Sequence, residues 1–231
     1  MQALPFDRIA KKYDRVNDFL SLGLHRSWKE ELVNALLSEH GRIPDRVLDV
    51  ATGTGDVAGL FKHKGSREVI GLDPSEEMLA LARARYGETI LWRAGHSEDL
   101  PIPSDSIDLI SCAFGVRNFR CRKAAFAEWR RVLRAGGRIG IVEIHPVPEI
   151  ALLTPIDWYW RHLVPPIGRL FGDEAAYQYL RDSAHAFLSP SGLGQELEAA
   201  GFRKLSHTPL FACGMVSFAL FQWDGICKQS N

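Results

Sequence analysis

Short apolar runs alternate along the chain with longer segments of helical periodicity. Residues 56–63, 75–87 and 123–137 place apolar side chains three and four positions apart, a spacing typical of helices with one buried face. The short runs are rich in β-branched residues and predict strands at 46–51, 68–73, 89–94, 107–114 and 138–144. This alternation predicts an α/β fold, with a parallel sheet covered by helices on both faces.

Turn residues predict where several elements begin and end. Ser75 is expected to cap the helix that follows it, and the pair Gly136–Gly137 is expected to end the helix before the fifth strand. The pair Ser189–Pro190 predicts the start of a last helix, which ends at Gly201. Two more strands are predicted after it, around 204–209 and 215–223.

Composition and charge narrow the function classes. The 231 residues include 28 Lys and Arg and 28 Asp and Glu, so the formal net charge is zero, and 46% of the residues are hydrophobic. This balance predicts a folded globular protein and excludes binding to nucleic acid by phosphate neutralisation. The four cysteines form no Cys-x-x-Cys pair and have no histidine at ligand spacing, so no metal is expected. Without a secretory leader or about 20 consecutive apolar residues, a cytoplasmic location is expected.

The first chemical signal is the glycine-rich turn Asp49–Asp56 after the first predicted strand. Gly53 and Gly55 allow a ligand to approach the backbone closely, and Asp73 ends the next strand, where a carboxylate is placed to bind ribose hydroxyls. The pattern fits a nicotinamide dinucleotide as well as S-adenosylmethionine. The acids at both ends of the turn would repel a pyrophosphate and attract a sulfonium, so the second ligand is favoured.

With this turn and four further motifs, the chain resembles the class I S-adenosylmethionine methyltransferases, and within them the C-methyltransferases of menaquinone and ubiquinone biosynthesis. The most specific motif is Tyr13–Trp28, which is similar to the amino-terminal signature of that family. The other matches are the turn 49–56, Gly115–Asn118, Arg131–Arg138 and Tyr177–Leu180. The resemblance implies a Rossmann-like sheet of seven strands with helices on both faces.

The resemblance also divides the chain, which is expected to be a single domain over 1–231. Prolines interrupt the segment after Ile144, and Trp158, Tyr159 and Trp160 add an aromatic cluster, so a helical lid is predicted there. The predicted parts are an N-terminal helical cap at 1–44, a cofactor-binding half at 45–145, the lid at 146–188, and a C-terminal helix with strands at 189–231.

The implied cofactor contacts come from the turn and from the ends of the next two strands. Thr54 and Gly55 would meet the methionine end, and Asp73 the ribose, although Asp73 alone is also compatible with a helix-capping acid. Met78 would pack on the adenine, although its spacing also suits a core residue. His96 and Ser97 would lie at the adenine amino group, where the family usually has an acid or amide in the first position. The predicted set is Asp49, Gly53, Thr54, Gly55, Asp73, Met78, His96 and Ser97.

The implied catalytic residues are Arg117, Asn118 and Tyr13. Arg117 would stabilise an oxyanion, and the three would hold a water that takes up the proton. The alternatives are a surface salt bridge for Arg117 and a helical segment that only caps the sheet for Tyr13. Two other positions depart from the family: Ala135 replaces a proline, and Ala219 a histidine.

The predicted reaction is S-adenosylmethionine-dependent C-methylation of a prenylated hydroquinone, of the demethylmenaquinol or ubiquinone-precursor type. The alternative is a class I methyltransferase for another, water-soluble, small aromatic metabolite. The substrate class implies transient contact with the inner face of a membrane, for which Trp158, Trp160 and Arg161 have suitable chemistry. The same aromatics also suit a lid or the interface of a homodimer.

Overall fold

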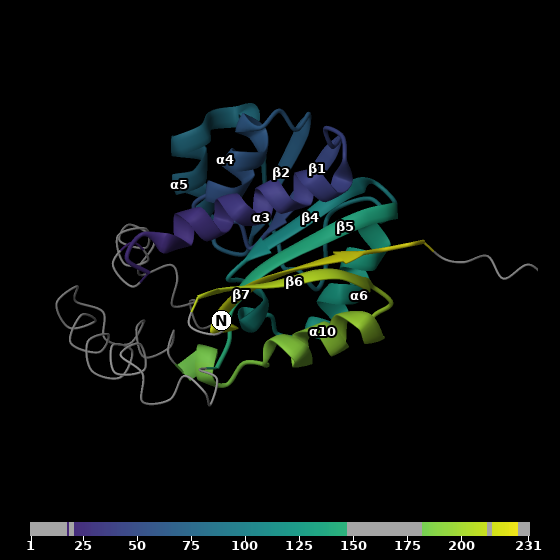
Figure 1. The fold of residues 1–231 in the computed structure, drawn as a ribbon. Helices are drawn as coiled ribbons and strands as arrows, with labels where there is room; N and C mark the ends of the chain where they lie inside the picture. Colours follow the sequence, from purple (N-terminus) through teal and green to yellow (C-terminus); the bar gives the residue numbers. More distant parts are fainter. Residues whose placement is uncertain (1–17, 19–20, 147–181, 212–213, 226–231) are drawn as a thin grey trace, which may run out of the picture.

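The computed structural model of the 231-residue chain describes residues 18, 21–146, 182–211 and 214–225. These residues form one sheet of seven strands in the order β3-β2-β1-β4-β5-β7-β6 (Figure 1). The strands are β1 (Arg46–Val50), β2 (Glu68–Asp73), β3 (Leu91–Ala94), β4 (Ile107–Ala113), β5 (Leu133–Ile144), β6 (Arg203–Phe211) and β7 (Val216–Gln222).

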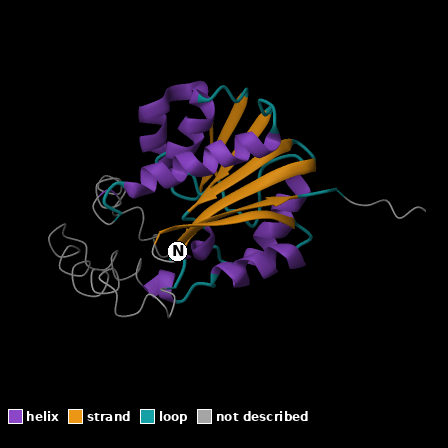
Figure 2. Cartoon of the chain, in the orientation of Figure 1, coloured by secondary structure: helices purple, strands orange, loops and turns teal. Residues whose placement is uncertain are grey.

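The helices cover both faces of this sheet (Figures 1 and 2). One face packs against α3 (Leu24–His40), α4 (Asp56–His63) and α5 (Glu76–Tyr86), with Leu32, Phe61 and Leu79 in the core between them. The other face packs against α6 (Arg122–Val132) and α10 (Pro190–Ala199), with Trp129 and Leu197 fully buried. Two short 3-10 turns complete the described part, η2 (Gly87–Thr89) and η3 (Val116–Asn118).

The topology fixes where a ligand can bind. Strands β1 to β5 run parallel, and β7 inserts antiparallel between β5 and β6. From β1 the chain builds the sheet first towards β3 and then, through β4, towards β6, so the order reverses between β1 and β4. In open α/β sheets, ligands bind at the carboxyl ends of the strands beside such a reversal.

The predicted order of helices and strands is confirmed in the described residues. Strands β6 and β7 extend the parallel strands at one edge of the sheet through antiparallel pairing of β7. Ser75 caps α5, since its Oγ accepts a hydrogen bond from the Met78 N–H at 3.2 Å. Ser189 caps α10 in the same way through the Gly192 N–H. The third strand begins two residues later than predicted, at Leu91, because the residues before it form η2.

The predicted helix end at Gly136–Gly137 is wrong. Helix α6 already ends at Val132, and the two glycines lie inside β5. Leu133 is 2% exposed and pairs with Ile107, so burial of its side chain draws this residue into the sheet. The register of β4 and β5 then shifts, and Gly136 takes up the extra length with φ of 81°, which glycine adopts without strain.

Candidate active site

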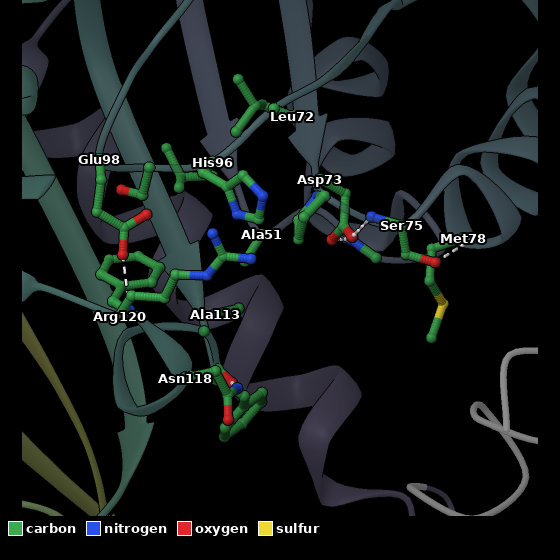
Figure 3. Close-up of a pocket in the computed structure, with 18 residues that line it drawn as sticks. Ala51, Leu72, Asp73, Ser75, Met78, His96, Glu98, Ala113, Asn118 and Arg120 are labelled. Atoms are coloured by element: carbon green, nitrogen blue, oxygen red, sulfur yellow. Dashed lines mark hydrogen bonds between the residues drawn. The ribbon is translucent and has the colours of Figure 1, made fainter. Parts of the chain in front are cut away.

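A pocket opens at the carboxyl ends of β1, β2 and β4 (Figure 3). It has a volume of about 860 Å³, including the part that opens to solvent. Figure 3 shows Asp73, Ser75 and Met78 along one side, and His96, Glu98 and Arg120 on the other. The lining also includes apolar groups from Val50, Ala51, Leu72, Phe114 and Phe119. Apolar walls with a few polar groups are typical of a small-molecule site.

Asp73 lies at the end of β2 and orders the adjacent turns. One carboxylate oxygen accepts a hydrogen bond from the Gly53 N–H at 2.8 Å, and the other from the Ser75 N–H at 2.9 Å. The residue is 7% exposed and lines the pocket. A carboxylate at the pocket wall is a suitable acceptor for ribose hydroxyls.

The turn after β1 is held in a strained shape by a buried carboxylate. Ala51 has φ of 55°, which is unusual for a residue other than glycine. Asp49 is 1% exposed, and its two oxygens accept hydrogen bonds of 2.6 Å from the hydroxyls of Thr52 and Ser111. Burial raises the pKa of Asp49 to about 6, against the effect of these bonds. Asp49 does not line the pocket, and it acts on the site by shaping the turn.

Gly53 and Gly55 have different surroundings. Gly53 lines the pocket with φ of 56°, and a methyl group added there would meet no atom within 4 Å. Gly55 is the residue immediately before α4, and an added Cβ there would be 2.7 Å from the Trp92 ring. Thr54 is 4% exposed and, like Gly55, is not among the residues that line the pocket. Gly53 therefore borders the space for a ligand, whereas Gly55 has no side chain so that Trp92 can pack closely against the turn.

Asp56 faces away from the pocket, which corrects the charge argument made from the sequence. Its carboxylate pairs with Lys29 of α3 at 2.8 Å and with Arg85 of α5 at 2.6 Å. Burial alone would raise the pKa of Asp56, but the two cations outweigh this effect and lower it. Asp56 of α4 thus forms ion pairs with α3 and α5 and joins the three helices. Its negative charge is balanced by these two cations, so it does not attract a cationic ligand.

The residues predicted at the adenine end do line the pocket. Met78 is 2% exposed and borders it from the first turns of α5. Ser97 accepts a hydrogen bond from the Trp129 indole N–H at 2.8 Å, which fixes its hydroxyl beside the wall. His96 projects into the pocket next to Arg120 (Figure 3). The structure thus gathers Gly53, Asp73, Met78, His96, Ser97 and Asn118 around one space.

Arg117 forms a buried ion pair with Glu143 of β5, not a surface salt bridge. The two side chains are 4% and 1% exposed. Asn118 lines the pocket, and its side-chain amide lies 3.4 Å from the Phe114 carbonyl. Arg117 is not part of the pocket wall, and it contacts the wall through the same carbonyl at 2.7 Å. Tyr13 lies outside the described residues, as do 147–181 of the predicted lid and Tyr177–Leu180.

Sequence reasoning missed Glu143, Arg120 and Phe114. Phe114 and Arg120 line the pocket, and Phe114 has φ of 60° at the end of β4. The signal for Glu143 was present in the sequence, because a carboxylate interrupts the apolar run 139–144 at the end of the strand. The sequence did not show that Glu143 pairs with Arg117, because the two residues are 26 positions apart.

The pocket fits the adenosyl part of S-adenosylmethionine. An acid at the end of β2 suits ribose hydroxyls, Met78 and Phe119 supply apolar surfaces for a flat ring, and the space beside Gly53 is open. Within the described residues, no group of three or more His, Cys, Asp or Glu is arranged to hold a metal ion.

Comparison with known proteins agrees with this geometry. The family model described as the ubiE/COQ5 methyltransferase family matches residues 3–220. The chain belongs to this family. Demethylmenaquinone methyltransferase of Thermotoga maritima is 42% identical over 212 residues, which cover 89% of this chain and 89% of that protein. The ubiquinone/menaquinone biosynthesis C-methyltransferase UbiE of Methylobacterium nodulans is 40% identical over 209 residues, which cover 87% and 82%.

Solved structures confirm the predicted fold. An S-adenosylmethionine-dependent methyltransferase of Thermotoga maritima has a TM-score of 0.66 at 20% identity, and the match covers 94% of this chain and 97% of that one. A methyltransferase bound to the Trm112 activator of Haloferax volcanii has a TM-score of 0.67 at 16% identity, with 96% and 99% covered. Family and fold together make the chain an S-adenosylmethionine-dependent methyltransferase. None of its described helices is long and apolar enough to cross a membrane.

Proposed function

We propose that this methyltransferase transfers a methyl group from S-adenosylmethionine to a ring carbon of a prenylated hydroquinone in quinone biosynthesis. The observation that carries the proposal is the 42% identity, over most of both chains, to a demethylmenaquinone methyltransferase. The pocket geometry supports it, because Asp73, Met78 and Gly53 surround the space that an adenosyl group needs.

The residues around the pocket have separable tasks in this reaction. The sulfonium of the cofactor supplies the methyl group. Asp73, Met78, His96 and Ser97 hold the adenosyl part between them in the pocket. Loss of a proton from a hydroquinone hydroxyl makes the adjacent ring carbon nucleophilic; once the carbon–methyl bond has formed, the ring loses its hydrogen as a second proton and the hydroxyl is regained. Arg117, Asn118 and Tyr13 hold a water that accepts the hydroxyl proton, and the Arg117 guanidinium stabilises the oxyanion that remains.

A direct assay tests the proposed function. The purified protein, S-adenosylmethionine and a prenylated demethyl-hydroquinone are mixed under a reductant, and the product is analysed by mass spectrometry. We expect a product one CH₂ heavier, and none from the oxidised quinone, which has no hydroxyl to ionise. Calorimetry should show binding of S-adenosylmethionine and S-adenosylhomocysteine but not of NAD. Equal or faster methylation of a tail-free, water-soluble phenol would instead favour the alternative substrate class.

We extend the proposal to transient contact with a membrane surface, because a polyprenyl substrate resides in the bilayer. The support comes from sequence alone: Trp158, Trp160 and Arg161 combine interfacial aromatics with a cation. The net charge of zero predicts weak, reversible contact.

Sedimentation with liposomes measures this contact. We expect a fraction of the protein to sediment with vesicles of anionic lipid, and the double substitution of Trp158 and Trp160 by serine to abolish that fraction. Ile43→Ser is the control, since Ile43 is an apolar residue that is 58% exposed. Sedimentation equal to a lipid-free sample would leave these aromatics to a lid or to a homodimer interface.

A further inference from the structure

The pair of Arg117 and Glu143 joins two elements beside the pocket. The guanidinium Nη1 donates a hydrogen bond to Glu143 Oε1, and the Arg117 backbone N–H donates to Oε2 at 3.2 Å. The Ile144 N–H also donates to Oε1, at 2.8 Å. The carboxylate therefore receives three hydrogen bonds in a position that is 1% exposed.

The sheet explains why the two residues meet. Along β5, Ile139, Ile141 and Glu143 share one face, because side chains alternate along a strand. The two isoleucines belong to the core beneath α6 and α10. Ala113, near the end of β4, pairs with Val142, so the residues that follow β4 reach Glu143 directly. Parallel register thus sets η3, which contains Arg117, against this carboxylate.

The pair also connects to the pocket wall. The same Nη1 donates to the Phe114 carbonyl at 2.7 Å, and Phe114 lines the pocket. Phe114 has a positive φ, a conformation that costs free energy unless its surroundings hold it. The Phe114 N–H donates to the Val142 carbonyl at 2.8 Å, so β5 anchors the N–H of this strained residue directly and its carbonyl through the Arg117–Glu143 pair. Glu143 and Arg117 together fix the turn from β4 into η3.

A buried ion pair is a costly way to join two elements. Desolvation of two charges offsets much of their attraction, and apolar residues of the same volume often stabilise a protein equally well. Unlike apolar residues, this ion pair holds the Arg117 guanidinium in a single orientation. Nη1 is held by two acceptors, while Nε is buried without a hydrogen-bond partner among the described residues. Glu143 is thus the only charged group that holds Arg117 in the described part of the chain.

We propose that Glu143 is a positioning residue for methyl transfer. It aims the Arg117 guanidinium and holds the turn after β4 in the shape that the site requires, without itself contacting the substrate. This role rests on the proposed function, in which Arg117 stabilises the oxyanion. Glu143→Gln preserves the shape of the side chain but removes its charge, so the guanidinium is no longer held by an ion pair between two charged groups.

Kinetics and NMR of Glu143→Gln test the proposal together. We expect kcat to fall about 10- to 100-fold, with KM and the affinity for S-adenosylmethionine within about threefold of wild type. A guanidinium held at Nη1 rotates slowly and gives separate Nη1 and Nη2 signals. In the variant, the Arg117 signals should merge. Glu196→Gln is the matched control, because it breaks another Arg–Glu pair, with Arg122, at the partly exposed surface, where the two side chains are 30% and 37% exposed.

The outcomes separate this proposal from the proposed function. If the wild-type protein methylates no prenylated hydroquinone, the function fails, and the NMR signals still report whether Glu143 orients Arg117. If it does methylate, a normal kcat or unmerged signals in Glu143→Gln overturn the positioning role. Should that variant not fold, Glu143→Asp keeps the charge but withdraws the carboxylate by one methylene. The same loss of kcat with unchanged KM is then expected, and wild-type turnover would overturn the proposal.

Discussion

Substitution of Arg117 by alanine is expected to lower turnover by about 100-fold or more while the affinity for S-adenosylmethionine stays nearly unchanged. A donor aimed at charge that develops only during the reaction contributes to kcat, and its loss has about this size. Arg117 does not line the cofactor pocket, so binding of the cofactor should tolerate the change. Steady-state kinetics and calorimetry on the same preparation measure the two quantities.

Because Arg117 pairs with the buried Glu143, a second variant is needed to separate an effect on catalysis from an effect on stability. Arg117→Ala leaves the Glu143 carboxylate buried without its cation, and breaking a buried ion pair in this way costs about 3 to 5 kcal/mol of stability. The double variant Arg117→Ala/Glu143→Gln removes both charges and should recover much of that loss. If the double variant folds and turnover stays low, then lost stability is not the cause of the low turnover of Arg117→Ala. If its turnover returns to normal, Arg117 serves only the fold. Arg122→Ala is the matched control for loss of an arginine.

Substitution of Asp73 by alanine is expected to weaken binding of S-adenosylmethionine by about 10- to 100-fold, or roughly 1.4 to 2.8 kcal/mol. Two effects contribute, since the carboxylate is placed to accept from the ribose and also holds the Gly53 and Ser75 N–H groups. Calorimetry measures the loss. Glu76→Ala is the control, because this acid is 65% exposed and does not line the pocket.

A ligand without a ribose hydroxyl separates the two effects of Asp73. S-adenosylhomocysteine and its 2′-deoxy analogue are titrated into the wild-type protein and into Asp73→Ala. If Asp73 binds the hydroxyl, then removing either partner removes the same interaction, and the two losses are not additive. Fully additive losses would place the ribose elsewhere and leave Asp73 as an organiser of the turns.

The sequence by itself determined the element order and the ligand end of the sheet. Apolar runs and helical periodicity are local properties, so the pattern 46–51, 56–63, 68–73 predicted β1, α4 and β2 within about one residue. Asp73 and Gly53 were found for the same reason: the residue after a parallel strand lies at the ligand end whatever the rest of the chain does. The family also followed from local motifs.

Only the tertiary structure decided which charges pair. Asp56 stands in the glycine-rich turn, yet the packing of α3 and α5 turns it towards Lys29 and Arg85. Arg117 and Glu143 meet because β4 and β5 are neighbours in register, and the extent of β5 itself depended on burial of Leu133 beside Ile107. Each partner is set by which elements become adjacent in the folded sheet. The local sequence pattern shows whether a segment forms a helix or a strand. Which oppositely charged residue a side chain pairs with depends on burial and on the register between segments that are distant in the sequence.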